Sequence, residues 1–130
     1  MTQQEKSLLL QDLCGRLPYG VKVNISASRP DLYDNFVKSI NDATINSIDL
    51  NIEKCRFKEF WWDTYIVNVR PYLRPMSSMT EEEKNDLFQL MGRGTDIERI
   101  DFYISHHFDY RGLIKKDLAL EAPEGMYKHE

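Results

Sequence analysis

The chain has 130 residues, 42% of them hydrophobic, which is enough for one ordinary core and predicts a single domain over residues 1–130. Its net charge is −4, from 17 basic and 21 acidic residues, so the chain as a whole is not attracted to nucleic acid or anionic lipid. No apolar run approaches the roughly 18 residues of a membrane span, which predicts no membrane partner.

The first 17 residues contain glutamines and charges where a signal peptide needs a continuous apolar region, so we expect a cytoplasmic protein. Cys14 and Cys55 lie far apart, without a CxxC or histidine pattern around either. We expect both to be reduced thiols in the core, and we expect no cofactor.

The N-terminal segment predicts a helix over about 3–15. Thr2 and Glu5 have the spacing of a capping box, and leucines follow at helical spacing. A turn at Leu17–Gly20 comes next, and alternating apolar and polar residues then predict a first strand over 21–27.

The middle of the chain, residues 31–58, gives weaker signals. Residues 36–40 fit both a helix and a strand, and we favour a short strand. Residues 41–44 have the composition of a turn, and alternation over 48–53 predicts a further strand.

A strand is also predicted over 64–70, with Tyr65, Val67 and Val69 on its buried face. Pro71 and Pro75 then direct the chain out of the sheet, with the intervening Tyr72 and Leu73 packed on the core.

Two helices are predicted in the C-terminal half. Thr80 with Glu83 and Thr95 with Glu98 form two more capping boxes, the first helix ends at Gly92 or Gly94, and the second stops before Gly112. A final turn or short helix packs residues 113–120, and 124–130 form a mobile tail.

Together these elements predict an α+β fold. It has an N-terminal helix, an antiparallel β-meander that can curl into a small SH3-like barrel, and C-terminal helices. The β-rich half covers about 18–76 and the helical half about 80–122.

Several long motifs resemble those of a family of small proteins encoded by gut Bacteroidales and by their phages and prophages. They are LPYGVKV at 17–23, WWD at 61–63, RPYLRPMSSMTEEE at 70–83, and HHFDYRGLI at 106–114 with LALEAPEGMY at 118–127. The resemblance implies an accessory protein of a bacterium or its mobile elements. It transfers no activity, substrate or catalytic residue.

The sharpest chemical candidate is the cluster of His106, His107 and Asp109. Histidine and carboxylate side chains bind Zn²⁺ and other divalent metals, and His106 and Asp109 are at i, i+3. A metal site needs further ligands, which no HExxH or cysteine pair supplies. A small metal-dependent enzyme is therefore the least favoured of three hypotheses.

A nucleic-acid surface is the second hypothesis. If the strand before them continues, Lys54, Arg56 and Lys58 share one face, with Arg70 available for phosphates and aromatic residues for stacking. The alternative is a solvated sheet edge whose charges discourage strand pairing between molecules, which the acidic composition favours.

The third hypothesis, which we favour, is a non-enzymatic interaction or regulatory module that binds another protein. Its distinctive residues are aromatic, proline and arginine, and they contain no acid, base and nucleophile set. Because aromatic residues and arginine dominate binding hot spots, we predict five contact residues: Trp61, Trp62, Tyr72, Arg74 and Arg111.

Overall fold

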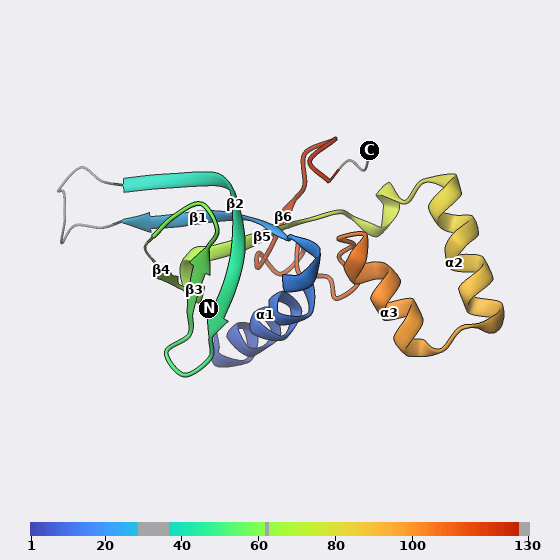
Figure 1. The fold of residues 1–130 in the computed structure, drawn as a ribbon, viewed down its shortest axis with the longest axis horizontal. Coiled ribbons are helices and arrows are strands. Elements are labelled where there is room, and N and C mark those ends of the chain that lie inside the picture. Colours follow the sequence, from blue (N-terminus) through green and yellow to red (C-terminus); the bar gives the residue numbers. More distant parts are fainter. Residues whose placement is uncertain (29–36, 62, 128–130) are drawn as a thin grey trace. The chain divides into compact units, whose positions relative to one another are not determined.

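The computed structural model describes residues 1–28, 37–61 and 63–127, and the chain divides into two compact units, Met1–Tyr72 and Leu73–Glu130 (Figure 1). The first unit contains α1 (Gln3–Arg16), η1 (Leu17–Tyr19), β1 (Lys22–Ser28), β2 (Val37–Asp49), β3 (Lys54–Phe57), β4 (Asp63–Tyr65), η2 (Ile66–Asn68) and most of β5 (Val69–Leu73). The second contains η3 (Met76–Ser78), α2 (Glu81–Arg93), α3 (Asp96–Ser105) and β6 (Leu120–Glu121).

The predicted α+β class is confirmed. The strands follow the order β4-β3-β2-β1-β5-β6, and the four strand pairings of the first unit are antiparallel. β6 is the neighbour of β5 in this order, and the Ala122 amide donates to the Leu73 carbonyl at 2.8 Å. The sheet is open, so the SH3-like barrel is not found.

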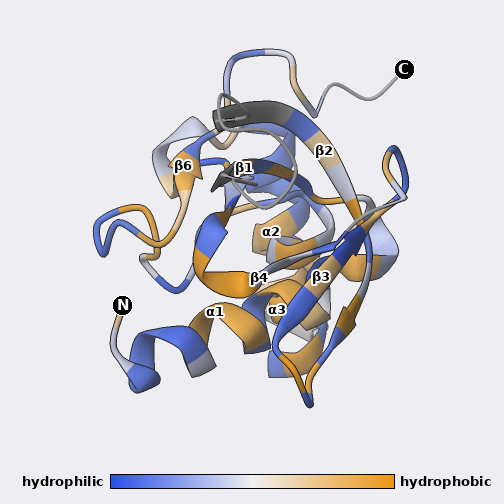
Figure 2. Cartoon of the chain, turned by 90° about the vertical axis from the view of Figure 1, so that its left-hand side faces the viewer, coloured by the Kyte–Doolittle hydropathy of each residue, from blue (hydrophilic) through white to orange (hydrophobic). Residues whose placement is uncertain are grey.

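The N-terminal helix is confirmed almost residue for residue. Thr2 accepts from the Glu5 amide at 3.0 Å and Glu5 accepts from the Thr2 amide at 2.8 Å, which completes the capping box. Figure 2 shows hydrophilic residues at the start of α1 and hydrophobic ones after them. Leu9 and Leu13 are fully buried in the core of the first unit.

The middle of the sheet differs from the prediction, because β2 is one long strand. The predicted turn at 41–44 is wrong. Ala43 pairs with Val23 and Asn41 with Asn24, so Asp42 is an extra residue in a β-bulge. A second bulge at Asn46 lies between the Ile45–Phe57 and Ser47–Arg56 pairs. The bulges allow β2 to pair first with β1 and then with β3.

The strand predicted over 48–53 is also wrong in its extent. β2 ends at Asp49, residues 50–53 form the turn to β3, and Glu53 has a φ of 55°. The predicted short strand at 36–40 lies partly outside the described residues, since the structure describes this segment from Val37 on, as part of β2.

The strand predicted over 64–70 is interrupted by η2. The turn shifts the alternation, so Tyr65 and Val67 are exposed whereas Ile66 and Val69 are buried. Pro71 does not leave the sheet, because β5 continues to Leu73 and Pro71 pairs with Val23 of β1. Tyr72 and Leu73 are both buried, as predicted.

In the second unit, both predicted capping boxes are present, and α2 ends at Arg93 with Gly94, one of the two predicted stop residues, as its C-cap. α3 ends earlier than its apolar pattern, since His106 caps it and His107 adopts a φ of 64°. Turns follow at 113–117, and of the predicted tail, residues 128–130 lie outside the described residues. None of the helices in the described part of the chain has the length and apolar character needed to cross a bilayer.

Candidate functional site

Arg74 is the polar centre of the second unit. Its guanidinium donates to the Glu83 carboxylate through both terminal nitrogens, at 2.7 and 2.8 Å. The same group donates to the carbonyls of Ser78 at 3.2 Å and His106 at 3.4 Å, and it lies 4.2 Å above the Phe108 ring. A bidentate guanidinium that also stacks on an aromatic ring is held in one orientation.

The electrostatics of this pair favour the charged form of Glu83. The hydrogen bonds from Arg74 lower the pKa of Glu83 from 4.5 to about 2, burial opposes the shift, and the Thr80 amide adds to it. Glu83 thus both caps α2 and neutralises Arg74.

A cleft of about 880 Å³ lies beside this pair, entirely within the second unit. Five carboxylates line it, those of Glu82, Glu83, Asp86, Glu121 and Glu124, together with Arg74, His106 and Tyr127. Of its two serines, Ser78 donates its hydroxyl to the Pro75 carbonyl at 2.7 Å. The cleft is acidic, and the Nδ1 atom of its lining residue His106 lies 2.8 Å from the Phe102 carbonyl and 3.2 Å from the Ser105 hydroxyl.

The three predicted metal ligands each have another role. Asp109 accepts from the amides of Leu113 at 2.7 Å and Ile114 at 3.0 Å, which makes it the cap of the turn that follows. The His106 Nδ1 lies 2.8 Å from the Phe102 carbonyl, and the His107 ring stacks on Tyr127 with centroids 3.7 Å apart. Among the described residues, no three His, Cys, Asp or Glu side chains are grouped to hold a metal.

The five predicted contact residues fall in both units. Trp61 is 87% exposed and Tyr72 8% exposed, both in the first unit, while Trp62 lies outside the described residues. In the second unit, Arg74 is engaged with Glu83, and Arg111 is half-buried with its guanidinium 5.0 Å from the centre of the Tyr110 ring. Of the described four, Trp61 therefore offers the largest exposed fraction to a partner.

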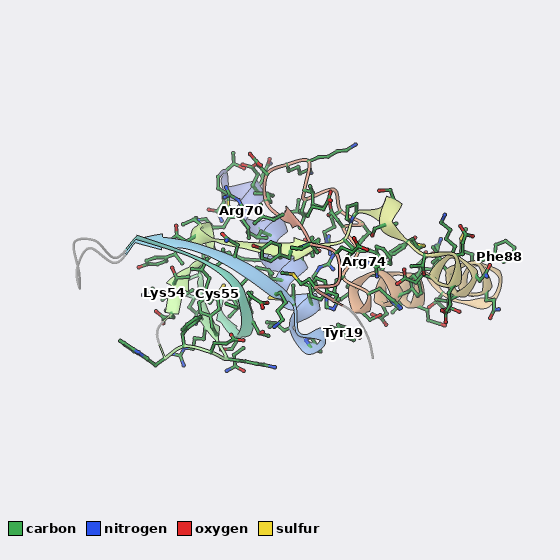
Figure 3. All side chains as sticks on the ribbon, turned by 90° about the horizontal axis from the view of Figure 1, so that it is seen from above. Tyr19, Lys54, Cys55, Arg70, Arg74 and Phe88 are labelled. Atoms are coloured by element: carbon green, nitrogen blue, oxygen red, sulfur yellow. The ribbon has the colours of Figure 1, made fainter. Side chains whose placement is uncertain are left out.

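The predicted nucleic-acid residues all lie in the first unit, where Lys54 and Arg70 are labelled in Figure 3. Lys54 pairs with Tyr65, and Arg56 with Asp63, across β3 and β4, so these side chains share one face opposite the buried Cys55. Lys58 is exposed just beyond β3, and Arg70 is half-buried in β5.

Acidic residues interleave with the basic ones on this face. Lys54 lies 3.7 Å from the Asp63 carboxylate and 4.7 Å from the centre of the Tyr65 ring. Asp49 is the partner of Lys54 on the other side, in β2. β3 is not an edge strand, since it pairs with both β2 and β4, so the predicted sheet edge is not found for Lys54 and Arg56. The balanced charges correspond to a solvated face of the sheet more closely than to a phosphate-binding surface.

The sequence analysis missed an exposed set of apolar side chains on α2 and α3, which we call the helix-pair surface. Its members are Phe88 (77% exposed), Met91 (62%), Ile97 (71%) and Ile100 (41%). Phe88 and Met91 are one turn apart on α2, and so are Ile97 and Ile100 on α3. Helical spacing was visible in the sequence, but which side of each helix packs inward was not.

The two cysteines are in the first unit. Cys55 is buried, and burial raises the pKa of its thiol to about 12, with a smaller contribution from Cys14. Such a thiol is protonated at neutral pH and is a poor nucleophile. The comparisons with known proteins add no further site, since no protein-family model, curated protein or solved structure matches the chain.

Proposed function

We propose that this chain is a non-enzymatic module that binds another protein through the helix-pair surface. The observation that carries the proposal is the exposure of Phe88, Met91 and Ile97, each more than 60% exposed on neighbouring helices. Single exposed apolar residues are common on protein surfaces, but a group at one-turn spacing on two packed helices is typical of a binding face. Trp61, in the first unit, remains a further predicted contact residue.

The hydrogen-bond network around Arg74 supports the same proposal. Arg74, Glu83, His106 and Asp109 are engaged in bonds that hold the second unit together, so they serve as a scaffold for the helices. A rigid support under an apolar face favours binding, because less conformational freedom is lost on association. We also propose, from the resemblance to the Bacteroidales and phage family, that the partner belongs to such a host.

The test is affinity capture of the tagged chain from a Bacteroidales lysate, with and without nuclease. The wild type is compared with Phe88→Ser/Met91→Ser and with Leu50→Ser. Leu50 is a matched control because it is also highly exposed, at 61%, but lies in the first unit.

We expect at least one protein that survives nuclease, is retained by Leu50→Ser and is lost with the α2 variant. Circular dichroism must show that both variants remain folded. Partners that all disappear on nuclease treatment would instead support the nucleic-acid hypothesis. Partners retained equally by all three chains would show that the helix-pair surface is not the contact.

A further inference from the structure

From the charges around the helix-pair surface, we infer that its partner is a cationic amphipathic segment, with apolar anchors flanked by lysine or arginine. The inference rests on the proposed function and adds the chemical class of the partner. The formal charge of the chain is divided unevenly. The first unit has nine basic and nine acidic residues, whereas the second has eight basic and twelve acidic, so the second carries the whole net charge of −4.

The acidic excess is concentrated on the two helices. Residues 81–101 contain seven acidic side chains and three basic ones. Lys84 lies 3.3 Å from Glu81, and Arg99 forms an ion pair with Asp96, so these basic groups are already matched within their own helices. Exposed carboxylates remain at four positions: Glu82, Asp86, Glu98 and Asp101.

One carboxylate shares a helix face with an apolar member, since Asp101 is at i+4 from Ile97. Glu82 and Asp86 instead line the cleft, so they contribute to the acidic surroundings of the surface and not to its contact face. A basic group in the partner would meet the Asp101 carboxylate while its apolar side chains cover Phe88 and the isoleucines. Such charge complementarity raises association rates and selects among partners.

The same charges argue against a second copy of the chain as the occupant. Two copies facing each other through these helices would bring two acidic segments together, each with four exposed carboxylates not matched within its own helix, and like charges at an interface are unfavourable. They also argue against nucleic acid on this face, since phosphate binding depends on local positive charge.

The experiment uses two fluorescein-labelled 18-residue peptides with identical apolar positions at helical spacing, one built from leucine and lysine and one from leucine and glutamate. Binding to the full chain is measured by fluorescence anisotropy at low and moderate salt. The variants are Phe88→Ser/Met91→Ser and Asp101→Lys. The controls are Leu50→Ser, as before, and Glu124→Lys, which reverses an exposed charge in the cleft.

We expect the lysine peptide to bind at least about tenfold more tightly than the glutamate peptide, and each helix variant to weaken it by about tenfold. The two controls should stay within about twofold of the wild type. Equal binding of the lysine peptide to the wild type and to the Phe88→Ser/Met91→Ser chain would overturn the inference, because the attraction would then be non-specific. A loss with Glu124→Lys as large as with the helix charge variant would overturn it in favour of the cleft.

Other outcomes separate this inference from the proposed function. Tighter binding of the glutamate peptide that depends on Phe88 would overturn the charge class and leave the binding face intact. If neither peptide binds, the cationic class is overturned and the lysate capture alone decides the proposed function. A concentration-dependent dimer in sedimentation, abolished by Phe88→Ser/Met91→Ser, would identify a second copy as the occupant and overturn the inference.

Discussion

Arg74 joins segments that are distant in sequence within the second unit. Its side chain bonds Glu83 of α2 and the carbonyl of His106. Its backbone amide donates to the His107 carbonyl at 2.7 Å, and its carbonyl accepts from the Asp109 amide at 2.8 Å. The arginine predicted as a contact residue therefore has a structural role that the sequence motif alone did not reveal.

The Arg74–Glu83 pair predicts a pH-dependent stability. Glu83 has a folded pKa of about 2 against an ordinary value of 4.5, so its contribution is complete above about pH 4.5 and is lost as the pH falls toward 2. Glu83→Gln should lower the free energy of unfolding at pH 7 by about 1–3 kcal/mol, because it removes a charge-assisted hydrogen bond. Glutamine still fits the capping box, so the cap is conserved.

Urea unfolding at pH 7 and at pH 3 measures this effect. The difference between wild type and Glu83→Gln should shrink at the lower pH, and Glu82→Gln, at an exposed neighbouring position, is the control. A difference that is the same at both pH values would show that the carboxylate charge is not what stabilises the pair.

Among the elements, those defined by local chemistry were predictable. Three capping boxes fixed the starts of α1, α2 and α3, because the threonine and glutamate involved are three residues apart. The course of β2 was not predictable, since a bulge is defined by its partner strand and Asp42 by itself is typical of a turn. The η2 turn was not predictable either. It shifts the alternation by one residue, so that Ile66 is buried and Tyr65 is exposed.

α1 also buries an ion pair that its sequence pattern could have indicated. The Arg16 Nε lies 2.7 Å from the Asp12 carboxylate, and both side chains are fully buried. Leu9, Asp12, Leu13 and Arg16 follow the i, i+3, i+4, i+7 spacing of one helix face. Asp and Arg are rarely fully buried unless they are paired, and here they share the buried face of the two leucines.

Breaking this pair should therefore be costly, whereas replacing both partners should not be. Asp12→Ala leaves a buried guanidinium without its carboxylate and should lower the free energy of unfolding by about 3–5 kcal/mol. Asp12→Leu/Arg16→Met should cost clearly less than Asp12→Ala, since no buried charge is left. A double-mutant cycle in urea with Asp12→Leu, Arg16→Met and the double variant tests this, and additive losses would contradict it.

At the scale of the whole molecule, the boundary between the two units falls inside a strand. Tyr72 ends the first unit and Leu73 begins the second, and both belong to β5. Independent domains are usually joined by an exposed linker, which this boundary lacks. The single domain predicted from chain length thus remains our prediction.

We expect one cooperative unfolding transition for the chain. Calorimetry should give a ratio of van't Hoff to calorimetric enthalpy near one. In hydrogen exchange measured near the melting temperature, the backbone amides of α1 and α3 should lose protection together. Two resolved transitions, or early exchange confined to α2 and α3, would contradict this and identify the units as separately folding domains.

The site was less predictable than the fold. The sequence indicated that aromatic and basic residues would be the contacts, but the exposure of Phe88 and Ile97 depends on how α2 and α3 pack. Helix amphipathicity predicts a buried stripe, and only the packed structure shows how much of that stripe stays uncovered.

The two bulges of β2 bear on how the chain can change in length. Removing Asp42 or Asn46 would restore regular two-residue alternation against β1 or β3, with the remaining side chains of residues 42–49 kept on their present faces. A deletion at any other interior position of the strand would transfer the residues beyond it from core to solvent. In relatives of this protein, single-residue gaps in this segment should therefore align with positions 42 and 46.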